Sequence, residues 1–316
     1  MRALVALWLL ALSLWADAHI FVYHRFGDTR YPTADTSVEV LKKQFDYFKT
    51  HGYEVVPLSR LVEALKKGEE IPDRWVVLTI DDGYKSFYEN GLPLFREYGY
   101  PFTLFVYTKA TEEKWGDYMT WEQVNEAKKY GELGFHSHAH PHMVSKSDAF
   151  LREDFRKGLA LMRKRTGEKA RYFAYPYGEY DARVRHIAES FGFDAICNQN
   201  MGAVSRASDP ADLDRIALTG DPSLPRKLKI RHLDARWLEP EKWPENGVVT
   251  TVHIRLKEPV KARKGWLYLT GYGWRKVPIE GSDVRVRLDK PLKNRRSRLI
   301  LKLQNDKIST KILVKP

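Results

Sequence analysis

Covalent cross-links and membrane-spanning segments are what this sequence most clearly lacks. Cys197 is its only cysteine, so no disulfide can form within the chain. We expect Cys197 to be a small buried side chain in the apolar segment 193–197 rather than a nucleophile. Beyond residue 18, no apolar run approaches the roughly 20 residues that a membrane-spanning helix needs.

The one long apolar run lies at the start of the chain. Arg2 precedes an apolar stretch, residues 3–15, which is followed by Ala16, Asp17 and Ala18. A short charged start, a short apolar stretch and a small-x-small sequence are typical of a signal peptide. We therefore predict a signal peptide over residues 1–18, no transmembrane segment after cleavage, and a periplasmic or secreted protein. A retained membrane anchor is the alternative.

Acidic residues are scarce in the last third of the chain. The formal net charge is +12, yet residues 222–316 hold 24 Lys and Arg against 9 Asp and Glu. The rest of the chain holds 29 basic and 32 acidic residues, so all the excess positive charge lies in this last third. This division predicts two domains with different roles.

Residues 19–220 alternate short apolar segments, typical of strands, with segments of helical spacing. The expected strands are 20–23, 75–80, 102–107, 133–136, 172–175 and 193–197. The expected helices are 38–49, 58–67, 86–98, 121–129, 147–165 and 182–191. The alternation predicts an α/β domain over 19–220, with helices outside a parallel sheet that is either open or closed into a barrel.

From residue 221 onwards, strands follow one another without helices between them. The expected strands are 248–256, 265–270, 283–288, 297–304 and 308–314. Short strands at this spacing predict a small all-β, sandwich-like domain over 221–316.

Three polar clusters follow expected strands of the α/β domain. They are Thr79-Ile80-Asp81-Asp82-Gly83, His136-Ser137-His138-Ala139-His140-Pro141 and Phe173-Ala174-Tyr175-Pro176-Tyr177-Gly178. The carboxyl ends of strands are where α/β folds place their active sites. Two histidines four residues apart and one carboxylate can bind a metal ion and leave a position open for water. A second carboxylate beside the first can move a proton, so the clusters predict metal-assisted hydrolysis of an amide or ester.

Each cluster has a plainer explanation when it is taken alone. Asp-Asp-Gly occurs in many turns, because Asp and Gly suit turn geometry. Two histidines in a polar loop need not bind a metal. The combination of all three clusters in this order is what points to a hydrolase.

The three clusters together resemble those of the polysaccharide deacetylases, carbohydrate esterase family four, over about residues 19–220. The resemblance implies a distorted (β/α) barrel of about seven strands. It implies that the metal ligands are Asp82, His136 and His140. It also implies that Asp81 is the general base and that the backbone N–H of Tyr177 helps to hold the oxyanion. A carboxylate and two neutral imidazoles suit zinc, and also cobalt, nickel or iron.

The chain departs from the commonest pattern of this family. Ala174 stands where an arginine often precedes the Pro-Tyr-Gly sequence, and segment 213–221 contains no histidine to protonate the leaving amine. A subset of the family, the exopolysaccharide poly-β-1,6-N-acetylglucosamine deacetylases, has a permuted order and supplies this histidine from the first strand. The resemblance therefore implies His24 as the general acid, with a hydrogen-bonded core histidine as the alternative. Arg25 is a candidate replacement for the missing arginine.

The leading hypothesis is an exported, metal-dependent N-deacetylase of an N-acetylglucosamine polysaccharide. The alternatives are deacetylation of peptidoglycan, chitin oligomers or another amide, or a non-catalytic glycan-binding protein. The candidate residues for lining a sugar groove are Tyr84, Trp121, Pro176 and Tyr180, with core packing as the alternative for the aromatic ones.

The basic C-terminal domain is also rich in aromatic residues, among them Trp266, Tyr268, Tyr272 and Trp274. It is a candidate for contact with anionic cell-surface glycans, and a merely solvated surface is the alternative. Nucleic acid is not an expected partner of an exported protein, although the charge alone would allow it.

Overall fold

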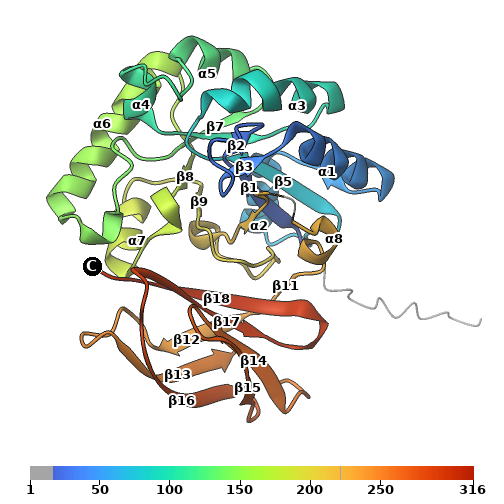
Figure 1. Ribbon diagram of the computed structural model, residues 1–316, viewed down its shortest axis with the longest axis vertical. Coiled ribbons are helices and arrows are strands. Elements are labelled where there is room, and N and C mark those ends of the chain that lie inside the picture. The colour runs from blue at the N-terminus through green and yellow to red at the C-terminus, as the bar shows by residue number, and fades with distance from the viewer. Residues whose placement is uncertain (1–16, 221) are drawn as a thin grey trace, which may run out of the picture.

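The computed structural model describes residues 17–220 and 222–316, and Figure 1 shows an α/β region above an all-β region. The predicted signal peptide lies outside the described residues except for Asp17 and Ala18. Both of these are buried, and Ala18 pairs with Val204. Among the described residues, none of the helices combines the length and apolar character needed to cross a membrane.

One parallel sheet organises the α/β region. Its strands are β1 (His19–Tyr23), β4 (Glu54–Val55), β5 (Trp75–Ile80), β6 (Thr103–Val106), β7 (Glu132–Phe135), β8 (Tyr172–Ala174), β9 (Ala195–Cys197) and β10 (Ile216–Ala217). They run in the order β10-β1-β5-β6-β7-β8-β9, with β4 beside β5. Near the two edges of the sheet, Cys197 of β9 forms an isolated parallel bridge with Leu213, three residues before β10. The predicted fold of about seven parallel strands is thus confirmed, as a barrel that does not fully close.

Helices cover the outside of this sheet (Figure 1). They are α1 (Val38–Thr50), α2 (Leu58–Lys67), α3 (Leu92–Tyr98), α4 (Thr108–Glu112), α5 (Trp121–Ala127), α6 (Asp148–Thr166), α7 (Ala182–Glu189) and α8 (Leu224–Lys227). The short helical turns are η1 (Phe87–Gly91), η2 (Met143–Ser145), η3 (Pro176–Gly178) and η4 (Pro210–Asp212). A small parallel pair, β2 (Arg25–Phe26) and β3 (Asp35–Thr36), follows β1.

Local sequence explains several of these elements. β5 is buried along its whole length, as an apolar strand in the middle of a parallel sheet should be. Thr120 begins α5 with a capping box, because its side chain and that of Gln123 each accept a backbone N–H. Gly68 ends α2 in the left-handed conformation, which costs glycine little. The helix expected over 86–98 differs from the prediction, because it begins as the π-helical turn η1 before α3.

Two antiparallel sheets form the all-β region. One has the order β11-β18-β17-β14-β15 and the other β12-β13-β16. The strands are β11 (Arg231–His232), β12 (Ala235–Glu239), β13 (Val248–Leu256), β14 (Lys264–Leu269), β15 (Gly273–Pro278), β16 (Asp283–Pro291), β17 (Arg296–Lys302) and β18 (Lys307–Val314), with the turn η5 (Gln304–Asp306). A cluster of Leu, Val and Ile side chains fills the space between the sheets.

The first of these sheets also packs against the barrel. Ile300, Ile308, Ile312 and Val314, on β17 and β18, belong to the same buried cluster as the barrel core. Thr310 donates a hydrogen bond of 2.7 Å to the carbonyl of Met201, in the loop after β9. The all-β region therefore lies directly against the loops that leave the carboxyl end of the parallel sheet.

Candidate active site

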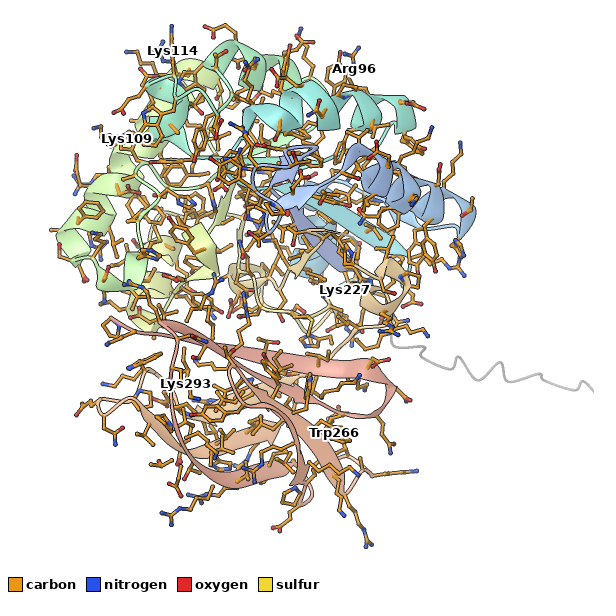
Figure 2. The ribbon with its side chains drawn as sticks, in the orientation of Figure 1. Arg96, Lys109, Lys114, Lys227, Trp266 and Lys293 are labelled. Atoms are coloured by element: carbon orange, nitrogen blue, oxygen red, sulfur yellow. The ribbon has the colours of Figure 1, made fainter. Side chains whose placement is uncertain are left out.

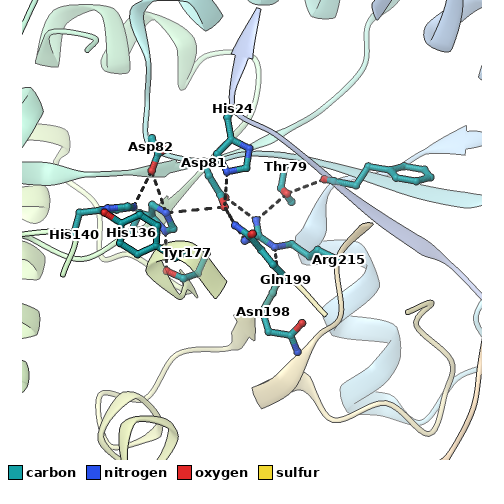
Figure 3. A network of polar contacts seen from close by, with 12 residues as sticks. His24, Thr79, Asp81, Asp82, His136, His140, Tyr177, Asn198, Gln199 and Arg215 are labelled. Carbon is teal, nitrogen blue, oxygen red and sulfur yellow. Dashed lines mark hydrogen bonds and ion pairs between the residues drawn. The ribbon is translucent and has the colours of Figure 1, made fainter. Parts of the chain in front are cut away.

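The predicted metal ligands come together at the carboxyl edge of the parallel sheet. Asp82 follows β5, whereas His136 and His140 follow β7. Asp82 Oδ1 lies 3.3 Å from His136 Nε2 and 3.0 Å from His140 Nε2, and the three candidate ligand atoms lie within 4.8 Å of one another. Figure 3 shows this group to the left of Asp81.

The chemistry of these three side chains fits a cation. His136 Nδ1 lies 2.8 Å from the carbonyl of Ala174 and can only donate to it, so in the neutral ring Nε2 carries a lone pair. That lone pair faces a carboxylate oxygen, which is also an acceptor. Asp82 Oδ1 and His140 Nε2 are buried without a hydrogen-bond partner among the described residues. Facing acceptors repel unless a proton or a metal ion lies between them, so the residues present fit a divalent ion.

Strained backbone accompanies this group. Asp82, Ser137, His140 and Tyr177 all have positive φ angles, between 49° and 72°, which residues other than glycine rarely adopt. The surrounding structure must hold these conformations, because each one costs about 1–3 kcal/mol.

Asp154 of α6 holds the histidine loop. Its carboxylate accepts hydrogen bonds from Ser137 Oγ at 2.8 Å and from the N–H groups of His138 and Ala139 at 3.0 and 2.7 Å. Ser137 Oγ in turn accepts from the N–H of His140. Ser137 therefore braces the loop, through a buried aspartate that the sequence had not indicated.

Asp81 has a different partner from Asp82. Both oxygens of its carboxylate accept from the guanidinium of Arg215, at 2.7 and 2.8 Å. Arg215 also donates to Thr79 Oγ1 and to the carbonyl of Asn198. Burial alone would raise the pKa of Asp81, but the positive charge and hydrogen bonds of Arg215 outweigh it and hold this pKa below its usual value. Asp81 is therefore ionised at neutral pH.

The proposed substitution of the missing arginine by Arg25 is wrong. Arg25 instead pairs with Asp28 and Asp117, and its guanidinium lies 3.6 Å from the ring centre of Tyr84. Arg215 occupies the place beside Asp81, from the segment between β9 and β10. Segment 213–221 thus supplies an arginine, where the commonest family pattern led us to look for a histidine.

The loop after β9 adds a second contact to Asp81. Gln199 Nε2 lies 3.3 Å from Asp81 Oδ2. Gly178, in the loop after β8, is so close to Gln199 that a Cβ atom at 178 would lie 2.6 Å from the Cβ of Gln199. The two loops are therefore packed against each other, and a side chain at 178 would push Gln199 away from the carboxylate.

His24 reaches the site from the end of β1. Its Nε2 lies 3.9 Å from Asp81 Oδ2, and its Nδ1 is buried with no hydrogen-bond partner in the described chain. The contacts of His24 therefore do not match the alternative, a core histidine that is hydrogen-bonded to a carbonyl. Burial lowers the pKa of His24 despite the two carboxylates nearby, so its ring is neutral at neutral pH.

Tyr177 lies at the rim of this group. Its ring is 39% exposed and stacks on His142 at 4.4 Å between ring centres, and it meets His140 edge-on at 4.5 Å. Figure 3 shows Tyr177 beside the two candidate ligand histidines.

The candidate groove residues occupy different environments. Tyr84 lies next to the Asp81-Asp82-Gly83 turn, half-buried between Arg25 and Tyr118. Trp121 is 7% exposed and donates to Glu112, which favours core packing. Pro176 is also buried, and Tyr180 stacks on Tyr175 while donating to Asp212. Of the four, Tyr84 lies nearest in the chain to Asp81 and Asp82.

The chain is similar to known deacetylases in sequence and in fold. The polysaccharide deacetylase family model matches residues 68–196. The poly-β-1,6-N-acetyl-D-glucosamine N-deacetylase of Escherichia coli K12 is 26% identical over 240 residues, which cover 63% of this chain. The match covers only 35% of that relative, so the chain spans about a third of its length.

Solved structures share the fold. The structure of IcaB from Ammonifex degensii superposes with a TM-score of 0.61 at 26% identity, covering 67% of this chain and 96% of that one. The Streptococcus pyogenes deacetylase PplD superposes with a TM-score of 0.62 at 23% identity, covering 68% and 97%. The residues that the family model matches include Asp81, Asp82, His136 and His140. The chain therefore carries a polysaccharide deacetylase domain.

Proposed function

We propose that this protein is an exported hydrolase that removes N-acetyl groups from an N-acetylglucosamine polysaccharide, with one divalent ion held by Asp82, His136 and His140. The observation that carries the proposal is the convergence of Asp82 Oδ1, His136 Nε2 and His140 Nε2 within 4.8 Å, beside a separate, ionised Asp81. The resemblance to poly-N-acetylglucosamine deacetylases supports this substrate. Zinc fits the ligand set best, and cobalt, nickel or iron also fit.

The residues of the chain divide the reaction between them. A bound divalent ion would polarise the acetyl carbonyl and lower the pKa of water from 15.7 toward about 7. Asp81 takes the proton of the attacking water, and the N–H of Tyr177 donates to the developing oxyanion, a contact worth about 3 kcal/mol in comparable sites. His24 gives a proton to the leaving nitrogen. Because His24 is neutral at rest, it must first gain that proton, and Asp81 Oδ2 at 3.9 Å is placed to pass it on.

Metal analysis followed by acetate release tests this proposal. We expect about one divalent ion per chain, and release of acetate from poly-β-1,6-N-acetylglucosamine in preference to chitin oligomers or peptidoglycan. The matched control is His136→Ala/His140→Ala, which should lose the ion and the activity together. Full metal occupancy in this double variant would contradict the ligand assignment. A metal-loaded wild type that releases no acetate from any of these glycans would favour a non-catalytic glycan-binding protein.

A further inference from the structure

One face of the β11-β18-β17-β14-β15 sheet continues beyond the barrel that it packs against. In antiparallel strands, directly paired residues share a face. Ile300 of β17 pairs with Tyr268 of β14, and Tyr268 pairs with Trp274 of β15. Ile300 is buried in the cluster that it shares with the barrel, whereas Trp274 is 45% exposed. The outer strands β14 and β15 therefore extend the barrel-facing side of the sheet into solvent.

This extension is aromatic and basic. Trp266 pairs with Lys276 as Tyr268 pairs with Trp274, so the four side chains form two adjacent rows on one face. We call these four residues the ledge. Trp266 is 44% exposed, and the Lys276 amine lies 5.2 Å from its ring centre. The rings of Tyr268 and Trp274 lie 5.3 Å apart. Figure 2 labels Trp266 on β14, below the barrel.

Exposed tryptophans on adjacent strands call for an explanation, because large exposed apolar groups that lie together mark interaction sites. The sheet has a buried side for such rings, yet the interior holds aliphatic residues such as Leu267 and Leu269. The tryptophans instead stand on the face that continues from the barrel.

The same face reaches the catalytic loops. Arg296 and Arg298 are two residues apart on β17 and therefore point to the same side as Ile300. Arg296 donates to the carbonyl of Tyr177, and Arg298 lies 3.3 Å from the carbonyl of Gln199. These are the loops that hold the candidate oxyanion donor and the Gln199 contact to Asp81. With strands about 4.8 Å apart and a rise of about 3.3 Å per residue, the ledge begins roughly 8 Å from Arg298, at Tyr268, and its two tryptophans lie about 12–14 Å away.

We propose that the ledge binds the acetylated polysaccharide strand a few sugars away from the unit that is being deacetylated. This inference rests on the proposed function and names where the rest of the polymer lies. Flat indole and phenol rings match the apolar faces of pyranose rings, and their polar edges, with the Lys276 amine, suit sugar hydroxyls and acetamido carbonyls. A polymer bound at the metal site and on the ledge would gain affinity without any new contact at the reacting bond.

Charge decides whether the ledge prefers acetylated or deacetylated polysaccharide. An N-acetylglucosamine unit is neutral, and deacetylation turns it into an ammonium. Arg296, Arg298 and Lys276 stand along the path from the catalytic loops to the ledge, so they disfavour a cationic strand there. The ledge therefore favours unprocessed polymer over product, which is discrimination by repulsion.

Removing the two exposed indoles tests the proposal. In Trp266→Ala/Trp274→Ala, we expect KM for the acetylated polymer to rise on the order of 10-fold with kcat nearly unchanged, because only binding shared by ground and transition states is lost. Hydrolysis of a small activated aryl acetate, too short to reach the ledge, should stay at the wild-type rate. Tyr130→Ala is the matched control. Tyr130 is another exposed aromatic residue, but it lies two residues before β7, at the amino ends of the sheet strands and so at the far end of the sheet from the candidate site.

A Tyr variant and a binding titration distinguish the loss of ring stacking from a loss of folding. Trp266→Tyr/Trp274→Tyr keeps flat rings and should restore most of the polymer KM, whereas equal losses in the Tyr and Ala variants would count against stacking. Titration of wild-type protein, monitored by tryptophan fluorescence, should show tighter binding of acetylated than of deacetylated oligomers.

An unchanged polymer KM in the Ala variant, with an active wild type, would overturn the ledge while leaving the proposed function intact. Tighter binding of an anionic glycan than of the acetylated oligomer would also overturn it, in favour of surface attachment. A wild type inactive on every glycan would instead mean that the proposed function has failed.

Discussion

The α/β and all-β regions handle charge in opposite ways. In the α/β region, the charges at the site are buried and held by partners, as Arg215 and Asp81 show at 1% and 0% exposure. In residues 222–316, basic side chains outnumber acidic ones by 24 to 9, and most of them lie at the surface. Preorganised, desolvated charge is what catalysis uses, whereas exposed charge mainly selects and steers partners. The comparison supports our two proposals, that the first region carries out the chemistry and that the second contacts a long substrate.

Backbone strain divides in the same way. Beyond the site, the positive φ angles of non-glycine residues in the all-β region fall at Asp289, Asn305 and Asp306, where Asp and Asn are tolerated in turns and strand irregularities. In the α/β region, four of the five such residues that the structure describes lie at one candidate metal site, and the fifth is Lys114. Strain of this kind persists only where neighbouring groups fix it, as Asp154 does for the histidine loop.

The largest expected effects concern the two adjacent carboxylates of the α/β region, Asp81 and Asp82. Asp81→Asn should keep the metal and lose on the order of 10²-fold or more in turnover, because the base is lost but the ligands remain. Asp82→Asn should weaken metal binding as well. Metal content and kcat, measured on the same preparations, check both expectations. Equal metal loss in the two variants would mean that the two roles are assigned wrongly.

His24 tests whether the leaving group is protonated from β1. His24→Ala should fold and bind metal normally, but slow amide hydrolysis by roughly 10²–10⁴-fold, because an amide nitrogen leaves poorly without a proton. The loss should be much smaller on an activated aryl ester, whose leaving group needs no proton. Rates on the two substrates provide the measurement. The same factor on both would remove His24 as the acid.

The buried pair of Asp81 and Arg215 predicts an effect on stability. Arg215→Met would leave Asp81 buried without a counter-charge and should cost about 3–5 kcal/mol in the free energy of unfolding. Asp81→Asn/Arg215→Met removes both charges and should recover most of that loss. Urea unfolding of the three proteins measures it, and a double variant as unstable as Arg215→Met would contradict a charge-based explanation.

The same pair sets a pH dependence. The folded pKa of Asp81 is depressed, so the pair stabilises fully above the pKa of an unfolded aspartate, about 4. Its contribution is lost as the pH falls through the lower folded value. The stability gap between wild type and Arg215→Met should therefore narrow in acid.

The smallest expected effect concerns the contacts between the two regions. Arg296→Ala/Arg298→Ala removes two hydrogen bonds to catalytic loops, each worth about 1 kcal/mol, and should lower kcat by roughly 5- to 10-fold on a small activated ester with metal content unchanged. Hydrogen exchange should speed up around Tyr177 and Gln199 and not in α1. Arg275→Ala, an exposed arginine on β15, is the matched control. Wild-type exchange and kcat in the double variant would show that the all-β region does not support these loops.

How far the sequence predicts this molecule depends on how local each signal is. Asp82, His136 and His140 lie in short clusters after apolar strands, so both their chemistry and their position could be read from the chain. The partner of Asp81 could not, because Arg215 lies 134 residues away and is one of 53 basic residues. Its one sequence signal is a charged pair, Asp214 and Arg215, between the apolar residues Leu213 and Ile216.

Edge strands are hard to predict from the sequence for a related reason. β15 has only Val277 buried, so it shows no alternation of apolar and polar residues. Cys197 behaves as expected, because it is buried in β9 and burial raises the pKa of its thiol to about 12. Trp121 was a candidate groove residue but is buried. An aromatic residue near a motif has the same sequence signal whether it contacts a sugar or packs in the core.

The order of strands in the parallel sheet has a consequence for the timing of assembly. β1 is made first, yet it lies between β5 and β10, and β10 is made last. Arg215 enters beside Asp81 only when this final strand docks, so Asp81 lacks this counter-charge while the earlier strands fold. Non-local parallel pairing of this kind forms slowly. A nascent chain can therefore carry all three clusters before Arg215 is in place, and the Asp81–Arg215 pair forms only when the last strand of the sheet docks.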